Sequence, residues 1–453
     1  LNPTFIQYIE LLKSKSCKIQ VNDIFHYIKK LKLLVEVMPL MEMHDFEIEF
    51  CLNITRKIIL FNLKEIKTLK FVENFLCSLS LNCFNNEYIF SVTKEEEDEL
   101  LKIEKNIHRN LLKKGKIFDL EILILSTYKR LVEYNWYPQI IEFKYPIIHK
   151  VQILDFIEEE RIRSSIKEKG LINDKISIEM KNQYELYPYP RWSGGKLEKK
   201  DITLTEYCDN LKLSVSYSDN IKRKDLKILV AGCGTGRQSI DISFRFPKSK
   251  ILAIDLSKSS LAYAIRKTKE LDKKNINYIC MDILNVNLLK ESFDYISCGG
   301  VLHHMKDPVL GWKKLLKCLN KNGLLEIALY SKSARKEILK FRSNYKIKKG
   351  TFNITDLKRI RQKMIDDNKD MRRTNIINNK DFFSLSGFKD LFVNENEIQY
   401  EISEIKKIVN DLDLSFCGFQ LSNYQTLKLR NEKIKDLSLK QLSLIEKKYP
   451  HFF

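Results

Sequence analysis

The 453-residue sequence contains no hydrophobic run long enough to cross a membrane. Its longest apolar stretches, such as Ile58–Phe61 and Ile122–Leu125, are far shorter than the ~18 residues of a membrane-spanning helix. The first residues, Leu1–Thr4, show neither the basic segment nor the apolar core of a signal peptide. We therefore expect no membrane partner and a cytoplasmic location. Because the chain begins with Leu rather than Met, we also expect it to be a fragment without its true N-terminus.

Cysteine clusters are also missing, although cysteine itself is present. The 10 cysteines include no Cys-x-x-Cys pair, and none is grouped with histidine at the spacing of metal ligands. This pattern argues against a disulfide scaffold and a zinc module, indicates no metal site, and favours reduced thiols. No internal repeat of fixed period is visible.

Positive charge is in excess. The chain has 79 Lys and Arg against 59 Asp and Glu, a net charge of +20, and residues 301–350 alone hold 13 basic and 3 acidic side chains. Two interpretations stay open. A lysine-rich composition can leave a solvated basic face, or the charge can serve an anionic partner such as a phosphorylated metabolite, nucleic acid or acidic protein.

Residues 1–170 are predicted to form a helical N-terminal domain. Thr93, followed three residues later by Glu96, is typical of a capping box, and apolar residues recur at helical spacing from Leu100 to Leu111. Apolar stretches at 71–90 and 117–132 also favour helices. This domain shows no catalytic pattern, and its isolated histidines are typical of structural or surface positions.

From residue 225 onward, strand and helix patterns alternate, which predicts a parallel, doubly wound α/β sheet. The expected strands cover 227–231, 250–254, 277–281, 293–298 and 324–329, and the expected helices 235–246, 258–271 and 307–319. We expect an aromatic and proline-rich lid and linker at 171–220, a core at 221–335, a basic insertion at 336–400, and a completion of the core at 401–453, with a helix at 402–412 and a strand at 414–420.

The segment Ile228–Gly236 is the most informative motif. A buried strand runs into glycines at 232, 234 and 236 and then into a helix, so a ligand can lie against bare backbone beside a helix N-terminus. The spacing differs from the dinucleotide fingerprint and lacks the Gly-Lys-Ser/Thr ending of a P-loop. Asp255 follows Gly236 by 19 residues, at the end of the second strand, where a carboxylate can accept hydrogen bonds from both ribose hydroxyls.

Two further strand ends add residues to the same edge. Asp282 follows the third strand, where it can face an exocyclic adenine amine. Gly299 and Gly300 end the fourth strand with small residues, and His303 and His304 follow them.

Together, the segments Val230–Gly236, Asp255, Met281–Asp282 and Gly299–Asp307 resemble class I S-adenosylmethionine-dependent methyltransferases over about residues 221–335. The resemblance implies a Rossmann-like domain with S-adenosyl-L-methionine as cofactor. A second resemblance, to bacterial methyltransferases often linked to tetratricopeptide repeats, rests on these further segments: Leu81–Tyr88, Gln183–Trp192, Tyr330–Arg335, Phe382–Phe392 and Phe416–Phe419. Asn394 and Asn396 depart from it, standing where we expect histidine-containing stretches.

The resemblance implies a role for each residue of the cofactor site. The methionine part of the cofactor would lie on the glycine turn, the ribose at the end of the second strand, and the adenine at the end of the third strand. The end of the fourth strand would line the floor of the site. The residues concerned are Gly232, Cys233, Gly234, Thr235 and Gly236, then Asp255 and Leu256, then Asp282 and Ile283, and finally Gly299 and Gly300.

The aromatic segment before the core is expected to fold over the cofactor as a lid. Tyr187 and Tyr189 would offer aromatic faces to the sulfonium, and Arg191 would pair with the cofactor carboxylate. The alternative is an extended aromatic linker that packs on the domain surface.

The expected reaction is an in-line methyl transfer to an unidentified acceptor, with His303 or His304 as general base. The alternative is that these histidines only stabilise the loop, leaving Asp282 or an aromatic hydroxyl as base. The basic stretch 332–373 favours an anionic small molecule or an acidic protein as acceptor. Two other functions stay open: a catalytically silent cofactor-binding scaffold, and an RNA-binding protein that uses the basic stretch, although nucleic acid is disfavoured by the few interleaved aromatics.

Overall fold

A computed structural model describes most of the chain. The described residues are 3–14, 19–41, 43–66, 69–113, 119–140, 143–192, 194, 197, 199–215, 222–347, 353–367, 376, 379–394, 396–421, 425 and 437–449. The chain divides into two compact units. The helical unit comprises Leu1–Glu158, Arg191–Gly195 and Thr351–Leu391, and the sheet unit comprises Glu159–Pro190, Lys196–Gly350 and Phe392–Phe453.

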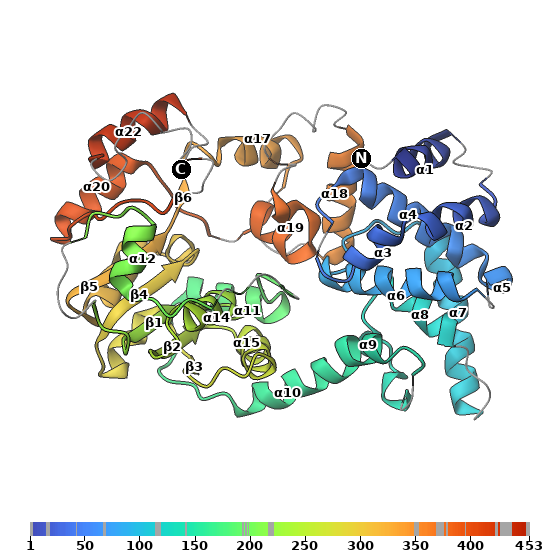
Figure 1. The fold of residues 1–453 in the computed structure, drawn as a ribbon, viewed down its shortest axis with the longest axis horizontal. Coiled ribbons are helices and arrows are strands. Elements are labelled where there is room, and N and C mark those ends of the chain that lie inside the picture. Colours follow the sequence, from blue (N-terminus) through green and yellow to red (C-terminus); the bar gives the residue numbers. More distant parts are fainter. Residues whose placement is uncertain are drawn as a thin grey trace. The chain divides into compact units, whose positions relative to one another are not determined.

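The helical unit is built from short helices, drawn in blue, cyan and orange in Figure 1. Its main helices are α1 (Pro3–Ser14), α2 (Val21–Lys30), α3 (Lys32–Val37), α4 (Phe46–Phe61), α5 (Leu63–Ile66), α6 (Lys70–Asn85), α7 (Lys94–Leu112), α8 (Asp119–Leu125), α9 (Pro146–His149), α18 (Ile354–Asp367) and α19 (Leu385–Phe392). The predicted capping box at the start of α7 is confirmed, because Glu96 Oε2 accepts from Thr93 N at 2.9 Å and Thr93 Oγ1 accepts from Glu96 N at 3.4 Å.

One buried ion pair ties the late segment 351–391 to the N-terminal helices. The guanidinium of Arg361 in α18 donates from both Nη atoms to the carboxylate of Glu49 in α4, each at 2.6 Å, and from Nε to the carbonyl of Phe382 at 2.7 Å. The units therefore differ from the boundaries expected from sequence. Part of the expected insertion 336–400 packs with the helical unit, and the rest belongs to the sheet unit.

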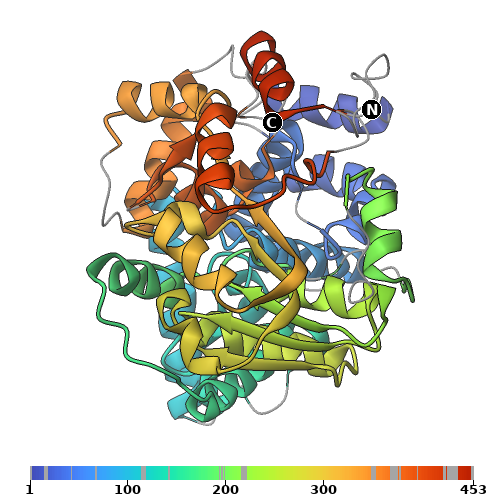
Figure 2. The same cartoon turned by 90° about the vertical axis from the view of Figure 1, so that its left-hand side faces the viewer.

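The sheet unit contains five parallel strands in the order β3-β2-β1-β4-β5. They are β1 (Lys227–Ala231), β2 (Lys250–Asp255), β3 (Ile276–Cys280), β4 (Phe293–Gly299) and β5 (Leu319–Ala328). Figure 2 shows them as twisted yellow-green and yellow arrows. The predicted Rossmann-like fold is thereby confirmed, and the five expected strands lie where the pattern placed them, with β5 beginning earlier than expected.

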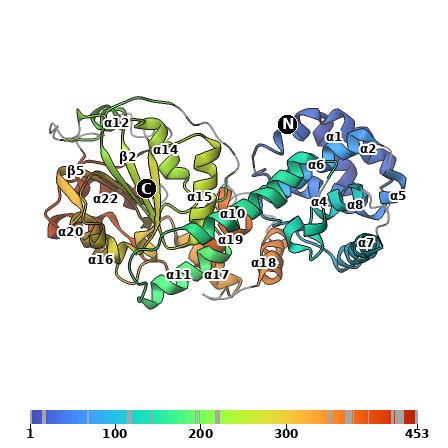
Figure 3. The same ribbon diagram turned by 90° about the horizontal axis from the view of Figure 1, so that it is seen from below.

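Helices cover both faces of this sheet (Figure 3). The helices α14 (Arg237–Arg245) and α15 (Lys258–Glu270) lie on one face, and α16 (Pro308–Leu316) and α20 (Ile402–Asp411) on the other. The strands are therefore buried from both sides, as in β1, where the last four residues of five are buried. A core cluster joins β1 and β4 to α16 and α20 through side chains such as Leu229, Ile296, Trp312 and Val409.

The remaining elements of the sheet unit flank the sheet. They are α10 (Asp155–Ser165), which begins in the helical unit, α11 (Lys175–Leu186), α12 (Leu204–Asn210), the 3-10 helices η4 (Ile283–Leu289) and η5 (Leu302–His304), α17 (Lys336–Asn344), α22 (Leu439–Lys448) and the paired short strands β6 (Tyr330–Ser331) and β7 (Gln399–Tyr400). No helix in the described ranges is both long and apolar enough to cross a bilayer.

One predicted element is wrong. Residues 414–420, expected to form a strand, alternate in large part between more and less exposed positions but form no strand. A backbone hydrogen bond joins this segment to an earlier part of the same chain, from Ser214 N to the carbonyl of Cys417 at 2.7 Å. Alternation reports which side chains face the core, whereas a strand also requires a ladder of backbone hydrogen bonds with a neighbour.

Candidate cofactor site at the carboxyl edge of the sheet

The strand order reverses direction between β1 and β4. In an open α/β sheet, the loops after two such strands separate toward opposite faces and leave a crevice at the carboxyl ends, which is where ligands bind. The loop after β1 holds the glycines at 232, 234 and 236, and the loop after β4 holds Gly299 and Gly300. The predicted motif residues are therefore brought together at the switch point.

Glycine is required in both loops for reasons visible in the backbone. Gly234 has φ +50°, and a side chain there would come within 2.5 Å of the carbonyl oxygen of Tyr189. Gly300 has φ +74°, but a Cβ there would meet nothing within 4 Å. The first glycine accommodates a neighbouring segment, whereas the second faces open space, the arrangement expected where a ligand approaches bare backbone.

Asp255 links the second strand to the glycine loop. Its Oδ2 accepts from Gly234 N at 2.8 Å, and its Oδ1 accepts from Ser257 N at 2.9 Å. Burial raises the pKa of Asp255 above its usual value, and these two hydrogen bonds partly offset that effect. Since each carboxylate oxygen can accept a second bond, the group can still bind a pair of hydroxyls.

The expected adenine side is formed by residues after β2 and β3. Asp282 is buried, and its Oδ1 accepts from Leu284 N at 2.9 Å, which caps the helix η4. Ile283 is buried beside it. The carbonyl of Leu256 accepts from the thiol of Cys280 at 3.4 Å. Asp282 thus has a structural role as an N-cap, and its second oxygen makes no hydrogen bond to a described residue.

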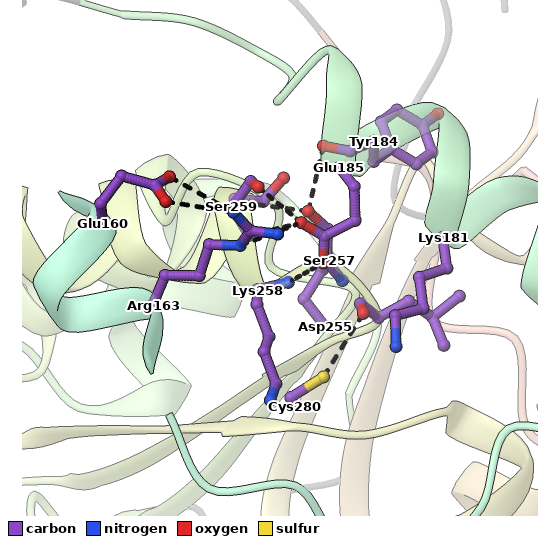
Figure 4. A network of polar contacts seen from close by, with 12 residues as sticks. Glu160, Arg163, Lys181, Tyr184, Glu185, Asp255, Ser257, Lys258, Ser259 and Cys280 are labelled. Atoms are coloured by element: carbon purple, nitrogen blue, oxygen red, sulfur yellow. Dashed lines mark hydrogen bonds and ion pairs between the residues drawn. The ribbon is translucent and has the colours of Figure 1, made fainter. Parts of the chain in front are cut away.

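Residues 184–190, here called the strap, comprise the last residues of α11 and the segment that follows it, and Figure 4 shows Tyr184 and Glu185 beside the N-terminus of α15. The carbonyl of Tyr184 accepts from Ser257 Oγ at 3.0 Å. The carboxylate of Glu185 accepts from Lys258 N at 2.7 Å and from Ser259 N at 3.1 Å, so it caps the N-terminus of α15. One end of the strap is therefore anchored just after β2, beside Asp255.

The other end of the strap is anchored just after β1. The carbonyl of Pro190 accepts a short hydrogen bond from Thr235 Oγ1, and the carbonyl of Tyr189 lies against Gly234. Tyr187 and Tyr189 are half-buried within this segment. Arg191 belongs to the helical unit, where its guanidinium carbon lies 4.2 Å from the ring centroid of Phe84.

The two histidines after β4 have different surroundings. His303 is 1 % exposed and stacks on Tyr330 with a centroid distance of 4.0 Å, and neither ring nitrogen has a well-formed hydrogen bond to a described residue. Burial, together with the charges of His304 and Arg335, lowers the pKa of His303 to about 2. An imidazole with so low a pKa is a poor general base at neutral pH.

His304 is held in one tautomer. Its Nδ1 lies 2.8 Å from the carbonyl oxygen of Asn396, so Nδ1 carries the proton and donates it, which leaves the lone pair on Nε2. Asn396 in turn donates from Nδ2 to the carbonyls of His304 and Met305, at 3.0 and 2.8 Å. Of the two predicted bases, His304 has the geometry for the role.

The structure adds residues that sequence reasoning missed. Gln238 in α14 donates from Nε2 to Ser297 Oγ at 2.6 Å and lies beside Gly299. Asn394, buried, accepts from Gln183 Nε2 at 2.8 Å. The sequence did not indicate a capping role for Glu185, because this residue lies 73 positions before the residue whose N–H it accepts. A carboxylate that caps a distant helix has no local sequence pattern. For Asn394 and Asn396, the sequence offered one signal, because both depart from the pattern of the methyltransferases linked to tetratricopeptide repeats.

Cys233 lies within the glycine turn between β1 and α14. It is buried, and burial raises its pKa well above the usual value for a thiol. Within the described part of the chain, no group of three or more His, Cys, Asp or Glu residues is placed to hold a metal ion.

The basic stretch 332–373 is not one surface. Arg335 forms a buried ion pair with Glu397 in the sheet unit, and Arg361 forms one with Glu49 in the helical unit. The exposed positive charges of the first part are Lys332, Lys336, Lys340 and Lys346, on and around α17. Arg372 and Arg373 lie outside the described residues.

Comparison with known proteins agrees with this geometry. Residues 228–323 match a family model described as a methyltransferase domain. An uncharacterized protein of Synechococcus sp. is 28 % identical over 204 residues, which cover 43 % of this chain and 48 % of that protein. The tRNA U34 carboxymethyltransferase of Campylobacter lari is 27 % identical over 190 residues, which cover 40 % of this chain and 62 % of that enzyme.

Among solved structures, PKMT2 from Rickettsia typhi in complex with AdoHcy is similar, with 19 % sequence identity, a TM-score of 0.40, and coverage of 57 % of this chain and 52 % of that chain. This chain spans about half the length of the first relatives that it matches.

The sheet order, the glycine turn and the family match together identify the central part of the sheet unit as a class I S-adenosylmethionine-dependent methyltransferase domain. S-adenosyl-L-methionine is the cofactor of this class. The expected link to tetratricopeptide repeats stays a prediction.

Proposed function

We propose that this protein transfers the methyl group of S-adenosylmethionine to an acceptor that carries negative charge. The open space in front of Gly300 carries the proposal, because it lies at the switch point, between the glycine turn after β1 and the end of β4. Asp255, with acceptor capacity left on both oxygens, fits a ribose beside that space. The strap, with Tyr187 and Tyr189, would then cover the cofactor. Because Arg191 packs on Phe84 in the helical unit, we leave it out of the proposed cofactor site.

The cofactor supplies a methyl group already activated on a sulfonium, so the transfer is an in-line displacement. The residues of this chain then have three tasks. The glycine loops and Asp255 hold the cofactor in position, and the strap excludes water. His304 Nε2 takes the proton that the acceptor loses as its new bond to the methyl carbon forms and the bond from that carbon to sulfur breaks. Alignment of this kind contributes on the order of 7–11 kcal/mol to lowering the barrier.

Support for a negatively charged acceptor comes from the exposed lysines on and around α17, which follow β5 and β6 in the sheet unit.

The location in the cytoplasm is part of the same proposal, because the nine described cysteines carry free thiols.

Gly300→Ala tests the cofactor site most directly. Since the new Cβ meets no protein atom within 4 Å, the substitution should leave the fold intact apart from backbone strain, yet it fills the space assigned to the cofactor. We expect the affinity for S-adenosylhomocysteine, measured by isothermal titration calorimetry, to fall by about tenfold or more. The matched control is Gly418→Ala, which also has a positive φ, +132°, but contacts Leu213 rather than the glycine loops. Equal affinities for both variants would refute the proposed site.

Methyl transfer itself requires a separate measurement. The protein should move radiolabelled methyl groups from S-adenosylmethionine to a component of a cell extract, and the labelled product should bind an anion-exchange resin. Cofactor binding without any labelled product would contradict the catalytic proposal, and a labelled cationic product would contradict the negatively charged acceptor.

A further inference from the structure

A chain of hydrogen bonds runs through the sheet unit from β5 to the floor of the proposed cofactor site. The carboxylate of Glu326 in β5 accepts from Ser297 Oγ in β4 at 3.3 Å, and Ser297 Oγ accepts from Nε2 of Gln238 in α14 at 2.6 Å. Ser297 is fully buried, and Gln238 and Glu326 are half-buried. Gln238 is the second residue of α14, so this chain ends two positions after Gly236, the last glycine of the turn.

The carboxylate at the far end fixes the direction of the whole chain. A carboxylate has no proton to donate, so the hydroxyl of Ser297 must direct its hydrogen toward Glu326. The oxygen of Ser297 is then left as an acceptor, and it can bond only to the NH2 side of the Gln238 amide. The amide oxygen of Gln238 is therefore turned away from Ser297.

Tyr295 adds a second hydrogen bond with the same direction. Its hydroxyl donates a short bond to Oε2 of Glu326, the oxygen to which Ser297 also donates. Burial, together with the charge of Glu326, raises the pKa of Tyr295 well above its usual value, so this hydroxyl keeps its proton. One carboxylate oxygen thus accepts two hydroxyl protons, and the direction of the chain is set at its buried end.

The amide of Gln238 lies against the end of β4. A Cβ placed on Gly299 would come within 3.3 Å of Nε2 and 3.4 Å of Oε1 of this side chain. Oε1 makes no hydrogen bond to any residue in the described ranges. The chain therefore presents an oriented acceptor, which the described protein groups do not use, at the floor of the proposed cofactor site.

The chemistry of the cofactor indicates which group this acceptor would take. S-adenosylmethionine has three kinds of hydrogen-bond donor: the α-ammonium, the ribose hydroxyls and the adenine amine. In the proposed site the ribose lies at the end of β2 and the adenine at the end of β3, both on the side of β1 away from β4. The α-ammonium belongs to the methionine part on the glycine turn after β1, so it is the donor nearest to β4.

We propose that Gln238 binds the α-ammonium of the cofactor through Oε1, and that Glu326 is a positioning residue that turns this oxygen toward the ammonium through Ser297. The inference rests on the proposed function, because it requires the cofactor in the assigned crevice. An amide oxygen attracts a cationic nitrogen, whereas an amide N–H repels it, so the direction of the chain decides whether Gln238 helps or hinders binding.

Gln238→Met tests the contact itself, because methionine is similar in shape but has no amide oxygen. We expect its affinity for S-adenosylhomocysteine, measured by isothermal titration calorimetry, to fall by about tenfold or more. Methylthioadenosine lacks the whole amino-acid part of the cofactor. At millimolar concentration it should raise the melting temperature of this variant as much as that of the native protein.

A matched pair at Glu326 tests the direction of the chain. Glu326→Gln keeps an acceptor for both hydroxyls, because Ser297 and Tyr295 bond the same oxygen and an amide oxygen can take its place, so the affinity for S-adenosylhomocysteine should stay near the native value. Glu326→Met removes the acceptor and leaves Ser297 free to donate to Gln238. Its affinity should fall by about threefold or more.

The outcomes separate this inference from the proposed function. A native protein that binds no S-adenosylhomocysteine would contradict the proposed function itself. Where the native protein binds, the role of Gln238 is overturned if Gln238→Met binds S-adenosylhomocysteine equally tightly, or if its response to methylthioadenosine is lost in parallel. Equal affinities of Glu326→Gln and Glu326→Met would show that Glu326 does not position the amide.

Discussion

At the scale of single residues, hydrogen bonding separates the roles of two adjacent buried histidines. His303 stacks between Tyr330 and His304 in a dry environment, whereas His304 donates from Nδ1 to a backbone carbonyl and keeps a lone pair on Nε2. Sequence alone made them equivalent candidates for the base. Their different hydrogen bonding depends on Asn396, which lies 92 positions further along the chain.

His303 should make the protein sensitive to acid. Its pKa is lowered to about 2 in the folded state from 6.5, so only the unfolded chain takes up this proton as the pH falls below 6.5. Stability is therefore full above pH 6.5 and is lost at about 1.4 kcal/mol per pH unit below it. His303→Phe should remove this loss, so its free energy of unfolding, measured with urea at pH 6.5 and 4.5, should change by about 2–3 kcal/mol less than that of the native protein.

The control for this prediction is His108→Phe, a change at an exposed histidine of α7. If His303→Phe and His108→Phe lose stability in parallel with the native protein, the buried imidazole is not the source of acid sensitivity.

His304→Gln should impair the chemical step selectively. Glutamine can preserve a hydrogen bond to the carbonyl of Asn396 but cannot take up a proton. Under saturating cofactor we expect turnover to fall by about 100-fold or more, with unchanged affinity for S-adenosylhomocysteine. Full turnover in this variant would show that another group is the base, and a parallel loss of cofactor affinity would point to a structural role in the loop.

At the scale of elements, the strap joins two loops that belong to different strands. It is anchored to α15 through Glu185 and to the glycine turn through the carbonyl of Pro190. Because both anchors lie at the carboxyl edge of the sheet, the strap shares its environment with the proposed cofactor site. This arrangement supports a lid in preference to a linker that only packs on the domain surface.

Glu185→Ala should release one end of the strap. The carboxylate accepts two backbone N–H groups at the start of α15, so its loss should destabilise the sheet unit by about 1–2 kcal/mol and weaken cofactor binding severalfold. The control is Glu206→Ala, which removes the N3 glutamate of the capping box of α12, a capping carboxylate that comes from its own helix rather than from the strap. Thermal denaturation and calorimetry together distinguish the outcomes. Loss of stability in both variants without a difference in cofactor affinity would contradict a role for the strap.

At the scale of the whole molecule, the two units are each assembled from distant parts of the chain. The helical unit recruits residues 351–391 across the entire methyltransferase domain, and the ion pair between Glu49 and Arg361 spans 312 positions in the sequence. The segment that reads as an insertion into the sheet unit is therefore in part a structural component of the helical unit.

Glu49→Ala should destabilise the helical unit by about 3–5 kcal/mol, because it leaves the guanidinium of Arg361 buried without its partner. Adding Arg361→Met should recover much of this loss, since both charges are then removed. Scanning calorimetry with and without S-adenosylhomocysteine can assign the transitions, because the ligand should stabilise the sheet unit. If the double variant is no more stable than Glu49→Ala, the ion pair is not what makes the single change harmful.

The sequence by itself determined the α/β class, the positions of the five strands along the chain and the nature of the cofactor turn. These features depend on local signals: the period of apolar residues, the capping residues, and glycines where the backbone needs a positive φ, as at Gly234. The Thr93 capping box and the Ser257 cap of α15 were predictable for the same reason.

Only the tertiary structure decided the features that depend on contacts between distant residues. The burial of His303, the anchoring of Glu185 and the pairing of Arg361 with Glu49 bring together side chains far apart in the chain. Desolvation and electrostatic interaction act through space, so residue type and spacing along the chain do not reveal them.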